Sequence, residues 1–324
     1  MKLSRVINDH DPMDAACAFE VELPPALARF GKTARFSLCG PDDAPVVVVL
    51  GGISANLFPC LDQAGGPGWW PGLTGKDCAV DPRRHRILGV DFIADPSGRT
   101  APSPSDQAEM IVAALDRIGV ARALAVVGAS YGGMIALSLA EHFPARVERL
   151  VVISADARPH PAATAIRALQ RRIVALGLAY GGAAEALSIA RGLAMTSYRT
   201  AEEFGVRFEG GIADDDVLGA SGPGDYLRAR GDAFGSVMSP ERFLSLSASI
   251  DRHDAVPERI DHPVLLIGAT SDQLVPPAHM KDLADRLAGP AELHLLGCLY
   301  GHDMFLKESA ALSALAAPFL ETGS

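Results

Sequence analysis

Three features are missing from this sequence: a long apolar run, an excess of basic residues and paired cysteines. No apolar run approaches the roughly 20 residues of a membrane-spanning helix, and residues 1–20 carry charges where a secretory leader would have an apolar core. The net charge is −10, which disfavours non-specific binding to nucleic acid or to an anionic membrane. An anionic substrate would therefore need a locally basic entrance.

The five cysteines are odd in number and show no C-x-x-C spacing of the metal-binding type. We expect reduced thiols and no metal site, which indicates a reducing compartment and hence a cytoplasmic protein. The cysteines are Cys17, Cys39, Cys60, Cys78 and Cys298. Repeats, low-complexity tracts and recognisable domain linkers are also absent.

Short β-branched or apolar runs alternate with segments of helical periodicity in most of the chain. This alternation predicts an α/β fold, with a parallel sheet covered by helices on both faces. An early strand pair is expected before it, ending near residues 34–38. The core strands are expected at 46–50, 86–91, 123–127, 149–154, 263–268 and 292–296.

The alternation stops at about residue 155 and resumes at about residue 260. The intervening sequence is helical and loop-like, with no convincing strand. We therefore predict a core of residues 1–156 and 259–324, and a helical lid of residues 157–258 over the carboxyl edge of the sheet.

The chemistry is expected to centre on Ser130, which has a glycine two residues before it and another two residues after it. An apolar strand precedes this G-x-S-x-G pattern and a helical stretch follows it. Such a pattern is typical of a nucleophile elbow, where strand turns sharply into helix and exposes the serine hydroxyl. The flanking glycines allow strained backbone and close packing.

A serine hydroxyl needs a base, and the base needs an orienting acid. Asp272 follows the strand at 263–268, and His302 follows the strand at 292–296, so the order Ser, Asp, His matches nucleophile-elbow enzymes. Two backbone N–H groups must also bind the oxyanion. We expect one from Tyr131 and the other from Ile53 or Ser54, between which the sequence does not decide.

Beyond these residues the chain resembles the homoserine O-acyltransferases of the α/β-hydrolase superfamily, the MetX-like enzymes of methionine biosynthesis. The most specific motif is the run Arg-Gly-Leu-Ala-Met-Thr-Ser-Tyr-Arg-Thr at 191–200, within the expected lid. The similarity spans roughly residues 45–310 and implies the α/β-hydrolase fold. Its other motifs are at 68–70, 130–134, 202–208, 225–227, 231–234, 249–254 and 301–306.

Two loops depart from the pattern of that family, at 51–56 and 92–100, and the chain is short for it. Both loops border the expected acyl pocket, so the acyl group and the acceptor stay open. A succinyl donor would need a cation in that pocket, and Arg99 is one possibility.

The resemblance implies that Arg191 and Tyr198 hold the carboxylate of the acceptor amino acid, and that Asp303 holds its ammonium group. A zwitterion in a desolvated pocket needs an opposite charge at each end. Plainer roles stay open: a solvated arginine at 191, a packing tyrosine at 198 and a helix N-cap at 303.

Two charged clusters in the expected lid can likewise be interpreted either as binding sites or as structural features. Arg167, Arg171 and Arg172 could form a basic entrance for coenzyme A phosphates, but a solvated face or a subunit contact is the favoured interpretation. The second cluster looks like a metal site at first, but we interpret its residues as structural. They are Asp251, His253 and Asp254.

We predict a homoserine O-acyltransferase with acetyl-coenzyme A or succinyl-coenzyme A as co-substrate and no bound cofactor. The resemblance also implies a homodimer formed through the lid. The alternatives are a serine O-acyltransferase of cysteine biosynthesis, a plain esterase or lactonase, and a non-catalytic binding protein.

Overall fold

A single sheet with the order β1-β2-β4-β3-β5-β6-β7-β8 forms the centre of the computed structural model, which describes residues 15–208 and 222–321. β2 runs antiparallel to β1 and β4, and every other neighbouring pair is parallel. The strands are β1 (Cys17–Glu22), β2 (Thr33–Cys39), β3 (Val46–Leu50), β4 (Arg86–Val90), β5 (Ala123–Ala129), β6 (Val147–Ile153), β7 (Val264–Ala269) and β8 (Ala291–Leu296).

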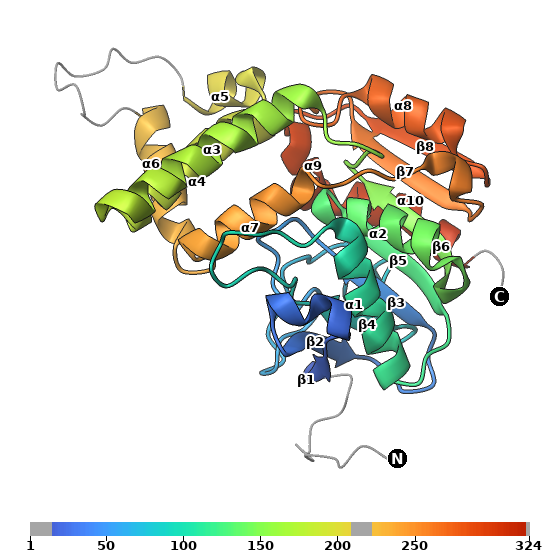
Figure 1. Cartoon of the computed structure of the whole chain (residues 1–324). Helices are drawn as coiled ribbons and strands as arrows, with labels where there is room; N and C mark the ends of the chain where they lie inside the picture. The colour runs from blue at the N-terminus through green and yellow to red at the C-terminus, as the bar shows by residue number, and fades with distance from the viewer. Residues whose placement is uncertain (1–14, 209–221, 322–324) are drawn as a thin grey trace.

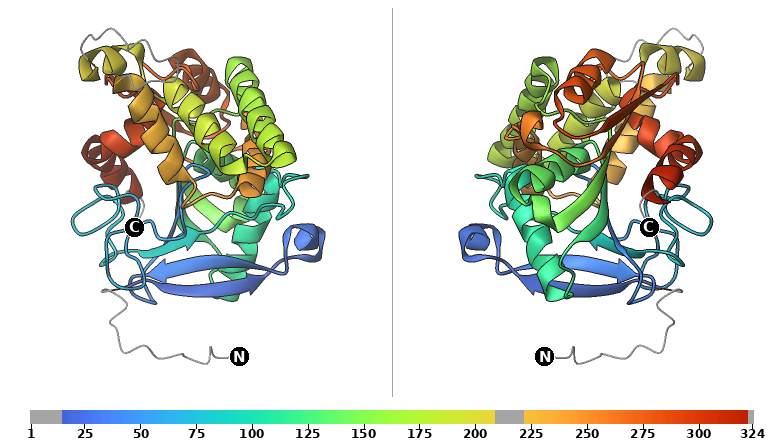
Figure 2. Two further views of the ribbon diagram at one scale, coloured as in Figure 1. Left: turned by 90° about the vertical axis from the view of Figure 1, so that its left-hand side faces the viewer. Right: turned by 90° about the vertical axis from the view of Figure 1, so that its right-hand side faces the viewer.

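The central strands are apolar on both sides because helices or loops cover both faces. In β3, Val46 and Val48 pack toward one face and Val47 and Val49 toward the other. The first face is covered by α1 (Pro104–Arg117), α2 (Tyr131–His142) and α8 (Pro277–Arg286); α10 (Ser309–Glu321) covers the second (Figure 2). The predicted sheet with helices on both faces is confirmed.

Within the described residues, five α-helices lie between β6 and β7, gathered at one end of the molecule (Figure 1). Residues 209–221 of this segment lie outside the described residues, and the described part of it contains no strand. That it acts as a lid with the limits 157–258 stays a prediction. The helices are α3 (Pro161–Tyr180), α4 (Ala183–Tyr198), α5 (Ala201–Arg207), α6 (Gly222–Phe234) and α7 (Pro240–Ile250).

Several elements are a single turn or little more. They are η1 (Pro25–Phe30), η2 (Pro144–Arg146), η3 (Pro257–Arg259), η4 (Gly301–Asp303) and α9 (Met304–Lys307). Of all the helices in the described ranges, none combines the length and apolarity needed to cross a membrane. The expected absence of a leader concerns mainly residues 1–14, which lie outside the described residues.

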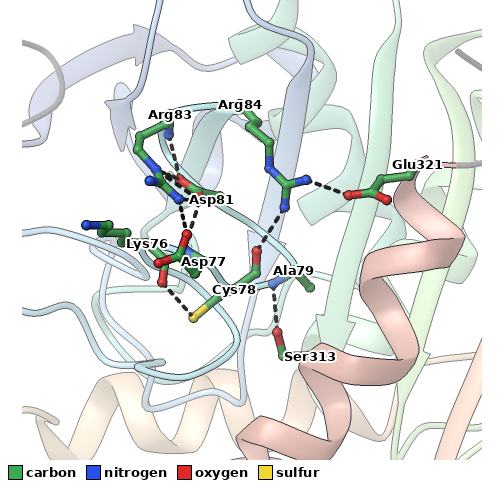
Figure 3. A network of polar contacts seen from close by, with 9 residues as sticks. All are labelled: Lys76, Asp77, Cys78, Ala79, Asp81, Arg83, Arg84, Ser313 and Glu321. Carbon is green, nitrogen blue, oxygen red and sulfur yellow. Dashed lines mark hydrogen bonds and ion pairs between the residues drawn. The ribbon is translucent and has the colours of Figure 1, made fainter.

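A polar network fixes the long loop between β3 and β4 to α10 (Figure 3). The fully buried carboxylate of Asp81 accepts hydrogen bonds from the side chain and the backbone of Arg83, and this guanidinium holds the pKa of Asp81 well below its usual range. The Ala79 amide donates to Ser313 Oγ of α10 at 2.7 Å. The network holds in place the loop that carries the fully buried Trp70.

Candidate active site

The tight turn at Ser130 joins β5 to α2, as the G-x-S-x-G pattern predicts. Ser130 has φ 54° and ψ −117°, a strained conformation for a residue with a side chain. A Cβ at Gly128 would lie 2.2 Å from the carbonyl oxygen of Gly132, and one at Gly132 would lie 2.4 Å from the carbonyl oxygen of Leu50. Only glycine therefore lets α2 start this close to β3.

His302 connects Ser130 to Asp272 by two hydrogen bonds. Its Nε2 lies 2.9 Å from Ser130 Oγ, and its Nδ1 lies 2.8 Å from Asp272 Oδ2. The other carboxylate oxygen of Asp272 accepts the backbone N–H groups of Leu274 and Val275 at 2.9 and 3.0 Å. The structure thus brings together the three predicted side chains in the geometry of a serine–histidine–aspartate triad.

Two opposing effects act on the pKa of His302. Burial of the imidazole disfavours its charged form, but the negative charge of Asp272 and the hydrogen bond to it outweigh burial and raise the pKa above its ordinary value. The charge of Asp303 acts in the same direction, whereas that of Arg167 opposes it. Such a histidine is stabilised in the charged form that proton transfer from serine produces.

The loop that carries His302 is held on several sides. Gly301 has φ 56°, and a Cβ there would lie 2.7 Å from the carbonyl oxygen of Tyr198, so glycine is required next to the histidine. The Trp70 indole N–H donates to the Phe305 carbonyl at 2.8 Å. The loop between β3 and β4 therefore supports the histidine from the far side.

The glycine-rich loop after β3 adjoins the serine turn because the Gly132 amide donates to Gly51 O at 2.9 Å. The amide of Tyr131, at the first turn of α2, makes no backbone hydrogen bond within the described ranges, and neither do those of Ile53 and Ser54. Ile53 is half-buried and Ser54 is exposed. The assignment of the oxyanion donors stays a prediction.

A pocket opens above Ser130 and His302 and extends under α3. Tyr198, at the end of α4, lines it together with Arg167 and Gln170 of α3. The Tyr198 ring lies 5.6 Å from the imidazole of His302, centroid to centroid. The helical segment between β6 and β7 thus supplies part of the wall around the triad.

The other two residues expected to bind an acceptor lie just outside this pocket wall. The Arg191 guanidinium lies over the Tyr198 and Phe234 rings, at 5.4 and 4.9 Å from their centroids. Asp303 pairs with the buried Arg199 at 3.3 Å, and its side chain makes no capping hydrogen bond at the start of α9. The plain N-cap role considered for Asp303 therefore does not explain its position.

The structure corrects two expectations about arginines. Arg99 is exposed and does not line the pocket, because Asp95 accepts hydrogen bonds from the backbone of Ser97 and Thr100 and folds the loop back on itself. Arg167 and Arg171 do not form a solvated face, since both pair with Asp251, the residue directly after α7, at 2.6 and 2.7 Å.

Asp251, His253 and Asp254 point to different partners. Asp251 binds the two arginines of α3, and Asp254 pairs with Arg158 at 2.6 Å. His253 is buried beside Ser138, and burial lowers its pKa to about 4. No group of metal-ligating side chains occurs among the residues that the structure describes.

Sequence reasoning missed three buried polar residues near the site. Arg199 and Glu203 form an ion pair behind Asp303, and Gln170 lines the pocket. Arg199 lies in extended backbone between α4 and α5, so its pairing with Glu203 depends on how the two helices are joined and not on a helical spacing. No local signal distinguishes Gln170 from a surface glutamine.

Comparison with known proteins defines first the class and then the family. The family model of the alpha/beta hydrolase fold matches residues 45–308. A solved homoserine O-acetyltransferase from Bacillus anthracis shares this fold, with a TM-score of 0.83 at 17% identity, covering 95% of this chain and 98% of that one. The class is therefore that of proteins with an α/β-hydrolase fold.

Two curated relatives narrow the class. The homoserine O-succinyltransferase of Xanthomonas campestris pv. campestris is 38% identical over 299 residues, which cover 89% of this chain and 79% of the relative. The homoserine O-acetyltransferase of Thermus thermophilus is 30% identical, with 82% and 75% covered. The chain belongs to the homoserine O-acyltransferase family.

Proposed function

We propose that this protein transfers an acyl group from acyl-coenzyme A to the side-chain hydroxyl of L-homoserine, a step of methionine biosynthesis. The observation that carries the proposal is the position of Tyr198, which α4 places within ring contact of the triad histidine. A hydrolase needs the triad and the oxyanion donors, whereas a transferase also needs a wall that holds an acceptor and excludes water. The names of the two relatives support the same reaction.

In the first half-reaction, Ser130 Oγ attacks the thioester carbonyl while His302 Nε2 takes the hydroxyl proton. The backbone amides of Tyr131 and of Ile53 or Ser54 donate hydrogen bonds to the tetrahedral oxyanion. The carbon–sulfur bond then breaks, His302 returns the proton to the coenzyme A sulfur, and an acyl-serine remains. Asp272 holds the tautomer of His302 and stabilises its charged form.

In the second half-reaction, the acceptor hydroxyl takes the place of coenzyme A. His302 removes its proton, the acceptor oxygen attacks the acyl-serine, and Ser130 leaves with the proton from His302. Arg191 and Tyr198 bind the acceptor carboxylate, and Asp303 binds its ammonium group. Asp303 shares Arg199 with Glu203, so its carboxylate is not fully neutralised by one partner.

We also propose a homodimer formed through α3. An apolar stripe on this helix supports the proposal: Leu169, Leu176 and Tyr180 are exposed and Ile173 is half-buried, at spacings of three and four residues. The five cysteines are all free, which fits a reducing, cytoplasmic location.

Acyl-coenzyme A enters as a co-substrate, and the mechanism uses no resident cofactor, metal, nucleic acid or membrane.

The direct test is thiol release from acetyl- and succinyl-coenzyme A, each alone, with L-homoserine and with L-serine. We expect release to rise strongly with homoserine. A larger rise with serine would move the enzyme to cysteine biosynthesis, since one methylene is worth only about 1–3 kcal/mol of discrimination. Release that is indifferent to both amino acids would leave a plain esterase and refute the proposal.

The role of Asp303 separates the two half-reactions. Asp303→Ala should leave acylation of Ser130 nearly unchanged, because the donor has no ammonium group, and should slow transfer to homoserine about 10- to 100-fold. Single-turnover thiol release measures the first step, and O-acyl-homoserine formation measures the second. Equal losses in both steps would show that Asp303 does not serve the acceptor.

A further inference from the structure

The pocket above Ser130 contains a cation that the proposed mechanism does not use. Arg167 lines the pocket together with Ser130 and His302, and its side chain is only 14% exposed. Burying a guanidinium costs free energy unless opposite charge or hydrogen bonds compensate it. The position of Arg167 therefore requires a physical explanation.

Asp251 compensates only part of this charge. Its carboxylate is shared between Arg167, at 2.6 Å, and Arg171, at 2.7 Å, so that the three side chains together carry one net positive charge. Arg167 also donates to Thr164 Oγ1 at 3.2 Å. Its Nη1 group has no partner among residues 15–208 and 222–321, so donors remain for a bound anion.

Gln170 adds a second, neutral donor at the same place. It lies three residues after Arg167 on α3, so the two side chains share a face of the helix. Gln170 is 4% exposed and lines the pocket, yet its amide has no hydrogen-bond partner within the described part of the chain. The amide is open to the pocket, so a ligand carboxylate can accept a hydrogen bond from its N–H group.

Two further charged groups lie at the pocket. Asp156 lines the pocket but pairs with His279 at 3.0 Å, and burial raises the pKa of Asp156. Arg158 lines it as well, mostly exposed and paired with Asp254. The part of the pocket wall formed by α3 therefore supplies N–H donors, from Arg167 and Gln170.

We propose that Arg167 and Gln170 form a subsite for the distal carboxylate of the acyl group, so that the donor is the coenzyme A thioester of a dicarboxylic acid such as succinate. The inference rests on the proposed function and names its donor. The guanidinium and the amide together present a fork of N–H donors that matches a carboxylate. An acetyl group would leave the Nη1 group of Arg167 and the amide of Gln170 without a partner, which disfavours it as the acyl group.

The test compares the two donors in the first half-reaction, where no acceptor is present. Single-turnover thiol release from succinyl- and acetyl-coenzyme A is measured for the wild type, Arg167→Met and Gln170→Leu. We expect the wild type to favour succinyl-coenzyme A. Each variant should lose about 10- to 100-fold in kcat/KM for the succinyl donor and stay within about threefold of the wild type for the acetyl donor.

Arg172→Gln is the matched control, because Arg172 is exposed on the same helix. This variant should not change the ratio of kcat/KM for succinyl-coenzyme A to kcat/KM for acetyl-coenzyme A. Gln170→Leu does not touch the Asp251 ion pairs, so it keeps the test valid if the melting temperature shows that Arg167→Met is unfolded. Equal losses for both donors would overturn the inference. The inference would also be overturned if Arg167→Met left acylation of Ser130 unchanged but raised KM for homoserine in the complete reaction. That result would assign Arg167 to binding of the acceptor.

Failure of the proposed function would look different. Thiol release that no amino acid accelerates would refute the transferase, while the donor ratio of the wild type and its variants would still decide whether the pocket selects a carboxylated acyl group.

Discussion

At the scale of single residues, the protonation state of His302 decides whether Ser130 can react. The imidazole must be neutral to accept the serine proton, and Asp272 holds its pKa above the ordinary value of about 6.5. The base is therefore lost as the pH falls through a value above about 6.5. We expect kcat/KM for the acyl donor to decline on the acid side with a midpoint in that region.

Stopped thiol-release assays between pH 5 and pH 9 would measure this midpoint. Asp272→Asn is the comparison: removing the charge should lower the midpoint and reduce the rate by up to about 10⁴-fold, because the tautomer is no longer held. If the acid-side midpoint of the pH profile were lower in the wild type than in Asp272→Asn, the assignment of Asp272 as the partner of His302 would be wrong.

The triad residues were predictable from sequence because each follows a recognisable strand. Ser130 comes directly after β5, and Asp272 and His302 lie in the loops that follow β7 and β8; parallel strands end at the same sheet edge. Arg167 and Gln170 carried no such signal. Their role depends on how α3 packs on Asp251, which lies 84 residues further along the chain than Arg167.

At the scale of elements, the packing of α6 on α4 positions the acceptor wall. Phe234 of α6 lies under Arg191 of α4, and the close approach is made at Gly231, where a Cβ would lie 2.4 Å from Ser188 O. Asp232 Oδ1 accepts a hydrogen bond from Ser188 Oγ at 2.8 Å beside it. A side chain at position 231 must therefore push the two helices apart.

We expect Gly231→Ala to destabilise the protein by about 1–3 kcal/mol and to raise KM for homoserine. Gly192→Ala is a matched control in the same interface, because its Cβ would meet Leu227 at an ordinary 3.6 Å. That control should be neutral or slightly stabilising. Urea unfolding and steady-state kinetics distinguish the two; equal stability of both variants would contradict the packing argument.

The sequence predicted the core strands well but could not divide the helical segment. A strand such as β3 is marked by a short β-branched run between loops, and its expected limits 46–50 agree with the structure. Between β6 and β7, alanine, arginine and glycine recur without a clear period. The boundaries there are set by caps such as Thr200 and Ser239, which were hard to recognise without the fold.

At the scale of the whole molecule, the exposed apolar stripe of α3 is the surface that the proposed dimer would bury. Tyr180 is 85% exposed and Leu176 is 58% exposed. We expect a dimer in solution by light scattering after size exclusion, and Leu176→Asp should shift it toward monomer because a buried unpaired charge opposes association. Leu295→Asp, at the exposed Leu295 of β8, should leave the dimer intact; a monomeric wild type would refute the interface.

The hydrogen bond between His302 and Ser130 joins residues 172 positions apart, whereas His302 and Asp272 are 30 positions apart. Contacts so distant in sequence form slowly, because a long chain segment must close before they can stabilise anything. A partly refolded chain can therefore contain helices and local turns, whose contacts are close in sequence, and still lack a reactive serine. Recovery of secondary structure by circular dichroism should precede recovery of labelling at Ser130, so activity reports the last stage of folding rather than its progress.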